Sequence, residues 1–440
     1  MAQAGSRSDH GGSLPGTPRG WRWHPRRDQV IAEAHARPSA PLVIPALVTR
    51  IAALSGEGGA ELDRSHMVEL ARKLALPEPA PGARWCVLDA GNWRLRWERH
   101  TEFSTWTFTR PAARAHPFAE TALDLAPAGW VAGIPGEVLV AVNLELRARE
   151  GAPSPASLLG HDAIGSRLLD GRASVFTDLR PDGQGLTRYL VLTEGNDPPL
   201  AGRIAQALLE IETYRLMALL AFPVAQATSA QLGPIEAEAG AVADALREEA
   251  GHEEDRKLLA RLIRLAGEAE ALSARAAFRF AAARAYYDIV QDRVASLREA
   301  PIEGLQTLSE FVERRLAPAM RTCRSTQQRL EDAIARIART GEMLDTRVEV
   351  AAEATSAKLL ASMDRRARLQ LRLQRTVEGF SVAAISYYAL GLLFYLLEPL
   401  ATKAGWDIKW AKAAAVPLVI AVVALGVARM RRRLKGDGPD

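Results

Sequence analysis

Hydrophobic residues are spaced differently in successive parts of the chain, and the spacing divides it into three regions. Between residues 21 and 198 short apolar segments alternate with polar turns, a pattern typical of mixed strands and helices. Between residues 199 and 379 apolar residues recur every three or four positions, which predicts long helices. From residue 380 onward two runs contain no charged side chain. The pattern predicts an α+β chain: a mixed α/β N-terminal domain, a long coiled-coil-like helical region and two C-terminal apolar helices.

Period-two alternation in the first region is clearest at residues 91–110. Large apolar and charged residues alternate there from Trp93 to Glu98, as in a half-buried strand. A second strand is predicted at residues 104–109, and it would pair with the first as a hairpin. Further strands are predicted at residues 137–146, 173–179 and 187–193. Helices are predicted at residues 30–34, 45–55 and 65–74.

The second region predicts helices of unusual length. One pattern, at residues 203–222, stops at Pro223, and another runs through residues 252–300 without a proline. After a break at residues 301–304 the helical spacing resumes, is interrupted only weakly at Pro318 and Gly341, and leads into the first uncharged run. Such lengths imply coiled-coil-like packing within one chain or between chains.

The two uncharged runs predict a transmembrane helical hairpin at residues 380–428. Residues 380–397 are 18 residues without a charge, close to the roughly 20 that a helix needs to cross a bilayer, and residues 413–428 form the second span. Arginines flank both spans on their outer sides. The topology-setting residues are Arg372, Arg375, Arg431, Arg432 and Arg433. By the positive-inside rule both ends of the chain are expected in the cytoplasm, with residues 429–440 as a basic tail. The alternative is a buried soluble helical hairpin.

Small or weakly polar residues recur along each predicted span at steps of three and four. They are Ser381, Ala384, Tyr388, Gly391 and Tyr395 in the first, and Ala414, Pro417, Ala421, Ala424 and Ala428 in the second. In lipid such seams indicate close helix–helix packing. A polar pore lining is the alternative, although neither span holds an ionisable side chain.

The amino-acid composition limits the cellular compartment and the kinds of partner expected for this protein. The 56 basic and 52 acidic residues nearly balance, so we expect no nucleic-acid partner. Two cysteines cannot build a disulfide framework, which fits a reducing compartment. Residues 1–20 are rich in Gly, Ser and Pro and lack an apolar core, so we expect a disordered tail and no signal peptide. The predicted location is the bacterial inner membrane, with two spans.

The candidate chemistry is confined to one cluster. Glu98, His100 and Glu102 would share a face if the strand continued, with His35 as a distant partner, and such groups could bind a metal or move protons. The alternative is a solvated face paired with neighbouring arginines. The sequence shows no phosphate-binding glycine loop, paired-cysteine metal site or nucleophile elbow. We therefore predict no enzyme and no cofactor.

Several long motifs resemble one bacterial family. They include HPRRDQVIAEAHARP, RWERHTEFSTWTFTRP, ALLEIETYRLMALLAFPVA and SMDRRARLQLRLQRTVEGFSVAAISYY. From about residue 24 to the C-terminus the chain is similar to the domain of unknown function 3422 family of membrane-anchored proteins. The resemblance implies two C-terminal spans and no established activity. Where a Gln-Asn pair is expected before Leu359 and Leu360, this chain has Thr355 and Ser356.

The order of regions also resembles the two-span magnesium channels of the CorA type. Those channels carry a Gly-Met-Asn motif at the end of the first span, and the corresponding stretch of this chain reads YLLEPLATKAGW. Glu398 is the candidate residue for an acidic pore mouth. We predict a membrane-anchored structural or interaction protein that forms a homo-oligomer with protein partners not specified by the sequence. The alternative is an oligomeric ion or solute channel.

Overall fold

The computed structural model describes residues 23–28, 30–31, 39–56, 59–112, 116–160, 162–248, 251–404 and 408–436. Residue contacts divide them into two compact units. The sheet unit contains the described residues up to Ala241 together with Arg264–Ile337, and the stalk unit contains Val242–Ile263 and the residues from Ala338 onward.

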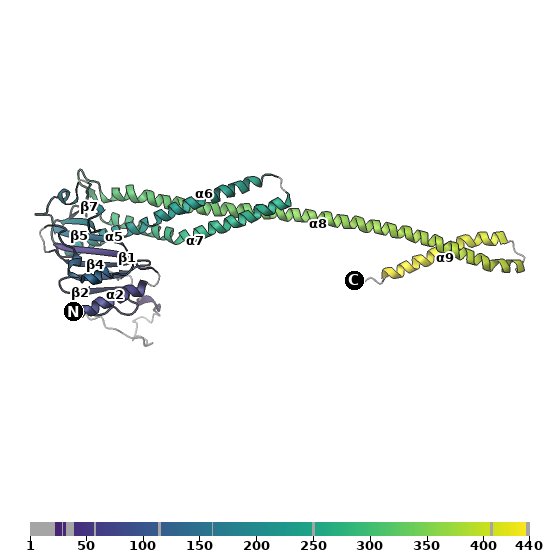
Figure 1. The fold of residues 1–440 in the computed structure, drawn as a ribbon, viewed down its shortest axis with the longest axis horizontal. Coiled ribbons are helices and arrows are strands. Elements are labelled where there is room, and N and C mark those ends of the chain that lie inside the picture. Colours follow the sequence, from purple (N-terminus) through teal and green to yellow (C-terminus); the bar gives the residue numbers. More distant parts are fainter. Residues whose placement is uncertain are drawn as a thin grey trace. The chain divides into compact units, whose positions relative to one another are not determined.

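A nine-stranded sheet organises the sheet unit (Figure 1). Its strands are β1 (Ala46–Leu54), β2 (Trp85–Asp89), β3 (Arg94–Arg99), β4 (Ser104–Pro111), β5 (Glu137–Ala148), β6 (Ile164–Leu168), β7 (Ala173–Pro181), β8 (Thr187–Thr193) and β9 (Ala300–Pro301). Their order across the sheet is β2-β3-β4-β1-β5-β8-β7-β6-β9. Neighbours pair antiparallel except β5 and β8, which pair parallel.

The prediction of a helix at residues 45–55 was wrong, because this segment is the central strand β1. It pairs with β4 on one side and with β5 on the other. All of its residues except Leu54 are buried. A strand covered on both faces is apolar on both faces, so its sequence lacks alternation and is easily mistaken for a helix.

The other predictions of sheet and helix in this unit agree well with the structure. The hairpin at residues 91–110 forms β3 and β4, and the three further predicted strands form β5, β7 and β8. The helix predicted at residues 65–74 is part of α2 (Gly59–Lys73), which begins earlier and ends one residue sooner. Strands β2, β6 and β9 were not predicted. Of the helix predicted at residues 30–34, residues 32–34 lie outside the described part of the chain.

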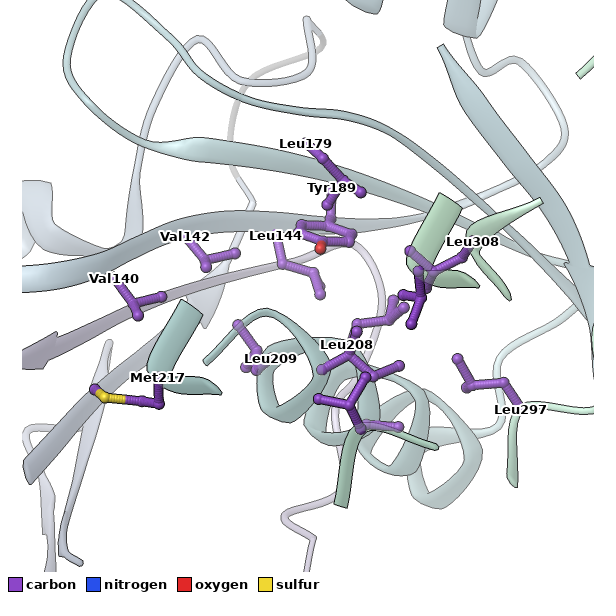
Figure 2. Packing of buried hydrophobic residues seen from close by; sticks show 14 of the residues in the cluster. Val140, Val142, Leu144, Leu179, Tyr189, Leu208, Leu209, Met217, Leu297 and Leu308 are labelled. Carbon is purple, nitrogen blue, oxygen red and sulfur yellow. The ribbon is translucent and has the colours of Figure 1, made fainter. Parts of the chain in front are cut away.

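Apolar clusters cover the sheet on both faces. On one face, residues from β1, β3 and β4 pack with α2 and with the short helices η1 (Ala122–Leu125) and α3 (Ala128–Ala132). On the other face, β5 and its neighbours pack against α5 (Pro198–Leu219) and against α7 (His252–Ser296). Figure 2 shows Val142 and Leu144 of β5 beside Leu208 and Leu209 of α5. The first turns of α8 complete this cluster with Leu308.

The helix predicted at residues 203–222 ends at Leu219, and Pro223 lies in the first turn of the following helix, where proline is tolerated. Long helices form the remainder, in agreement with the overall helical pattern of residues 199–379. They are α6 (Ala221–Ala245), α7, α8 (Leu308–Ala404) and α9 (Ile408–Gly436). Pro318 and Gly341 lie inside α8 without ending it, and α8 contains the whole of the first predicted span. The α+β fold class is therefore confirmed, with two long apolar helices in the C-terminal region.

Within the stalk unit, the end of α8 and helix α9 contact each other. Lys412 lies 5.4 Å from the centre of the Phe394 ring. Ser386 in α8 and Ala415 in α9 are both buried, whereas most residues around them are exposed.

Candidate functional site

A cavity of about 280 Å³ lies between the sheet and helix α5. Its floor is the α5-facing side of β1, β2, β3 and β4, and its roof comes from α5 and from residues 39–42. All of its described lining belongs to the sheet unit. Charged and apolar side chains meet in this cavity, so it is the candidate ligand site.

Strand register brings arginines and threonines together on the cavity floor. Arg50 of β1 lies opposite Thr107 of β4, and Thr107 lies opposite Arg96 of β3. In the adjacent row Thr109 pairs with Arg94. Residues directly opposite each other in a sheet point to the same face, so these side chains converge on the covered side.

Arg50 is the most unusual of these residues because it is only 6% exposed in the centre of β1. Its Nε donates a hydrogen bond to Thr107 Oγ1 at 2.9 Å. Among the described residues no further hydrogen bond or ion pair reaches its guanidinium. Burial lowers the pKa of Arg50 from its ordinary value, while the carboxylates of Glu98 and Glu210 oppose that shift. Arginine stays protonated in proteins, so this cavity holds a buried positive charge with spare donors.

The two other arginines on the floor each have a carboxylate partner. Arg94 donates to Asp89 at 2.7 Å, and Arg96 donates to Glu98 at 2.9 Å. The second pair is largely buried. Arg50 therefore differs from both, because no carboxylate lies within ion-pair distance of it in the described part of the chain.

Apolar side chains line the rest of the cavity. Leu42, Val48 and Leu209 are buried in its wall. Trp85 and Val87, on the edge strand β2, also line it but are 43% and 45% exposed. The site thus combines one charged donor group with an apolar wall that opens toward an exposed tryptophan.

The predicted metal-binding residues do not gather at one point. Strand β3 ends at Arg99, so the alternation expected to align His100 and Glu102 with Glu98 does not continue. Glu98 is on the cavity floor, His100 stacks on Phe103 with ring centres 4.3 Å apart, and Glu102 pairs with Arg279. His35 lies outside the described residues. Among those described, no group of three or more metal-ligating side chains is found.

Sequence reasoning missed Arg50, because it placed that residue on a predicted helix. The available signal was a single arginine inside the otherwise apolar run of residues 46–54. A charged residue in a strand buried on both faces costs free energy unless something compensates it, which often marks a functional position.

The residues assigned to the spans lie on α8 and α9. In this single chain the predicted seam residues face outward: all of those named in both spans are exposed. The buried residues on these two helices include Ser386 and Ala415, which do not belong to the predicted seams. Glu398, Arg372 and Arg375 are exposed on α8, and α9 continues through Arg431, Arg432 and Arg433.

The fold and the site together define an α+β protein whose sheet is covered on both faces and holds a cavity with a buried arginine. By length and composition, two of its helices could cross a membrane. A family model described as "Protein of unknown function (DUF3422)" matches residues 22–434. The chain belongs to this family, as its motifs indicated. No curated protein and no solved structure matches it.

Proposed function

We propose that this protein is anchored in the bacterial inner membrane by the end of α8 and by α9, with both chain ends in the cytoplasm. The sheet unit and the helices then serve as an interaction module that holds protein partners at the membrane. The observation that supports this most strongly is the exposure of large apolar side chains on both helices.

Exposed apolar surface in these helices is extensive. Tyr387, Leu392 and Tyr395 of α8 are 76%, 69% and 83% exposed, and Leu418 and Leu425 of α9 are 64% and 70% exposed. Only 6% of the residues in each apolar window are buried. Contiguous apolar surface costs about 25 cal/mol per Å² in water, so it requires a cover, and the hydrocarbon of a bilayer provides one.

The direction of insertion follows from the arginines. Arg372 and Arg375 precede the first window, and three consecutive arginines follow the second. The positive-inside rule favours the cytoplasm for both groups.

Membrane extraction and cysteine labelling test this arrangement. We expect the full chain to stay in the membrane pellet after alkaline carbonate washing. In a chain with Cys86→Ser and Cys323→Ser, Lys409→Cys should react with a membrane-impermeant maleimide in cells whose outer membrane is permeabilised. Lys435→Cys should react only after lysis. Release by carbonate, or the reverse labelling pattern, would contradict the anchor.

We also propose that the chain forms a homo-oligomer through the outward-facing seams. Small residues such as Gly391 allow close approach of helices in lipid. Gly391→Leu should then lower the oligomeric mass measured in lipid nanodiscs, whereas Ala383→Leu, on another face of α8, should not. Equal effects of the two changes would argue against this seam as the contact. Ion flux in liposomes that depends on Glu398 would support the channel alternative instead.

A further inference from the structure

We propose that the cavity between the sheet and α5 binds a small organic monocarboxylate, whose carboxylate group pairs with Arg50 and whose apolar body lies against Leu42, Val48 and Leu209. This inference does not depend on the membrane arrangement proposed above. It rests on the burial of Arg50, on the lack of a carboxylate partner for it among the residues that the structure describes and on the composition of the cavity wall.

Arg50 supplies the anchor for an anion. Its Nε is held by Thr107 at 2.9 Å, which orients the guanidinium and leaves its two Nη groups to donate elsewhere. A guanidinium presents those donors as a planar fork that matches the two oxygens of a carboxylate. Because the side chain is 94% buried, water cannot fully replace such a partner. An anion in the cavity would compensate both the charge and the donors.

The charge of the site favours a ligand with one negative charge. Arg94 and Arg96 already pair with Asp89 and Glu98, so of the three arginines on the floor only Arg50 has no ion pair within the described part of the chain. A doubly charged phosphate would bring a second negative charge close to Glu98, which also lines the cavity. Like charges in a poorly solvated site repel strongly. A carboxylate therefore fits better than a phosphate monoester.

The wall and the volume define the body of the ligand. Ligand pockets usually span about 300–1,000 Å³, so a cavity of about 280 Å³ admits only a small molecule. Its wall is mainly apolar, and Trp85 and Val87 expose large apolar surfaces at its edge. A short aliphatic or aromatic body would cover these side chains while its carboxylate reaches Arg50.

Calorimetric titration of the full chain in lipid nanodiscs tests the proposal. The probes are benzoate and straight-chain carboxylates of four to eight carbons, with hexanamide as the neutral analogue of hexanoate and hexyl phosphate as the alternative anion. We expect at least one carboxylate to bind at one site per chain, with Kd at least about tenfold lower than that of its neutral analogue, the ratio that one charge-assisted contact provides.

Variants then locate the site. Arg50→Met should raise Kd at least about tenfold, and Ala205→Leu, which fills the cavity without changing its charge, should do the same. Arg110→Met is the matched control, because Arg110 is equally buried but lies on the opposite face of β4 and outside this cavity. It should leave Kd unchanged.

Melting temperature separates a ligand site from a structural role. Removing an uncompensated buried charge should leave the melting temperature of ligand-free Arg50→Met equal or higher. If this variant does not fold, Thr107→Val and Ala205→Leu still test the proposed site, since both should weaken carboxylate binding. Equal affinity for hexanamide, binding of hexyl phosphate alone, absence of binding by every carboxylate, or unchanged Kd in the variants would overturn the proposal.

Discussion

Arg279 of α7 donates two hydrogen bonds to the carboxylate of Glu102, at 3.0 and 2.7 Å, although 177 residues separate them in the chain. The hydroxyl of Tyr286, also on α7, donates a third at 2.8 Å. Glu102 lies in the turn between β3 and β4. These contacts fasten the β3–β4 hairpin to the helical layer, so a residue considered for metal binding has a structural role here.

The Arg279–Glu102 pair should contribute measurably to stability. Glu102→Gln weakens three hydrogen bonds, two of them from a charged donor, and we expect the free energy of unfolding to fall by about 1.5–3 kcal/mol. Chemical denaturation followed by fluorescence measures the loss, and hydrogen exchange should increase in the turn at residues 100–103. Glu61→Gln, which removes an exposed pair with Arg64, should have no measurable effect. Similar losses in both variants would contradict this assignment.

Gly202 permits the close approach of α5 to the segment that roofs the cavity. A Cβ atom there would lie 2.0 Å from the carbonyl oxygen of Ala40. Gly202→Ala must therefore push residues 39–42 away, at a cost of about 1–3 kcal/mol, and should speed exchange of the Leu42 amide, which donates to Pro198. Gly240→Ala in α6 meets no atom within 4 Å and should raise the melting temperature. A higher melting temperature for Gly202→Ala would refute this reading.

Alternation in the sequence was enough to predict β3 and its hairpin partner β4, but not the central strand β1. In β3, Trp97 points to one face of the sheet and is buried in an apolar cluster, whereas Arg96 points to the other face and pairs with Glu98. Strand β1 has no polar face, so its apolar residues do not recur with the two-residue period of a half-buried strand. Its pairing with β4 and β5 depends on contacts far along the chain, which local spacing cannot reveal.

The candidate site was equally hard to predict from local sequence. The charged face of β3 was expected either to bind metal or to meet solvent, and the structure instead covers it with α5 and a segment before β1. Arg50 joins that face only through strand pairing with Thr107. Similarly, the span sequences identified the apolar helices, and the predicted seams are exposed in this single chain. Small residues favour any close neighbour, within the chain or outside it, so the seams alone do not identify the helix they pack against.

His66 should make stability depend on pH. Its ring stacks on Trp130, with centres 4.2 Å apart, and Trp130 Nε1 donates to the His66 carbonyl oxygen at 2.8 Å. Burial lowers the pKa of His66 below its ordinary value of 6.5. The unfolded chain therefore binds the proton more readily, so the stability that neutral His66 provides is complete above about pH 6.5 and is lost as the pH falls.

Melting curves between pH 7.5 and 5 test this expectation. Wild type should lose more stability on acidification than His66→Phe, which keeps an aromatic ring on Trp130 but cannot be protonated. His116→Gln is the control, because His116 is exposed, and it should follow wild type. A difference between wild type and His66→Phe that does not change with pH would show that His66 acts through packing alone.

Arg347 holds together three elements of the stalk unit. From α8 it donates to the carbonyl oxygens of Leu246 and Glu248, at 3.1 and 3.0 Å, and it pairs with the buried Asp255 at 3.3 Å. The last carbonyls of a helix lack partners within that helix, so Arg347 satisfies groups just beyond the end of α6. Arg347→Met should leave those carbonyls and Asp255 without this partner, at a cost on the order of 2–4 kcal/mol.

Hydrogen exchange of the full chain measures this effect locally. Protection should fall in residues 241–248 and 251–260 of Arg347→Met, while the strands of the sheet unit keep theirs. Arg347→Lys should be intermediate, because an ammonium group retains the charge but cannot reach two carbonyls and a carboxylate as a planar fork does. Thr355→Ala, an exposed change further along α8, should leave exchange near the end of α6 unaltered. If lysine restores full protection, charge alone accounts for the contact and the fork geometry is irrelevant.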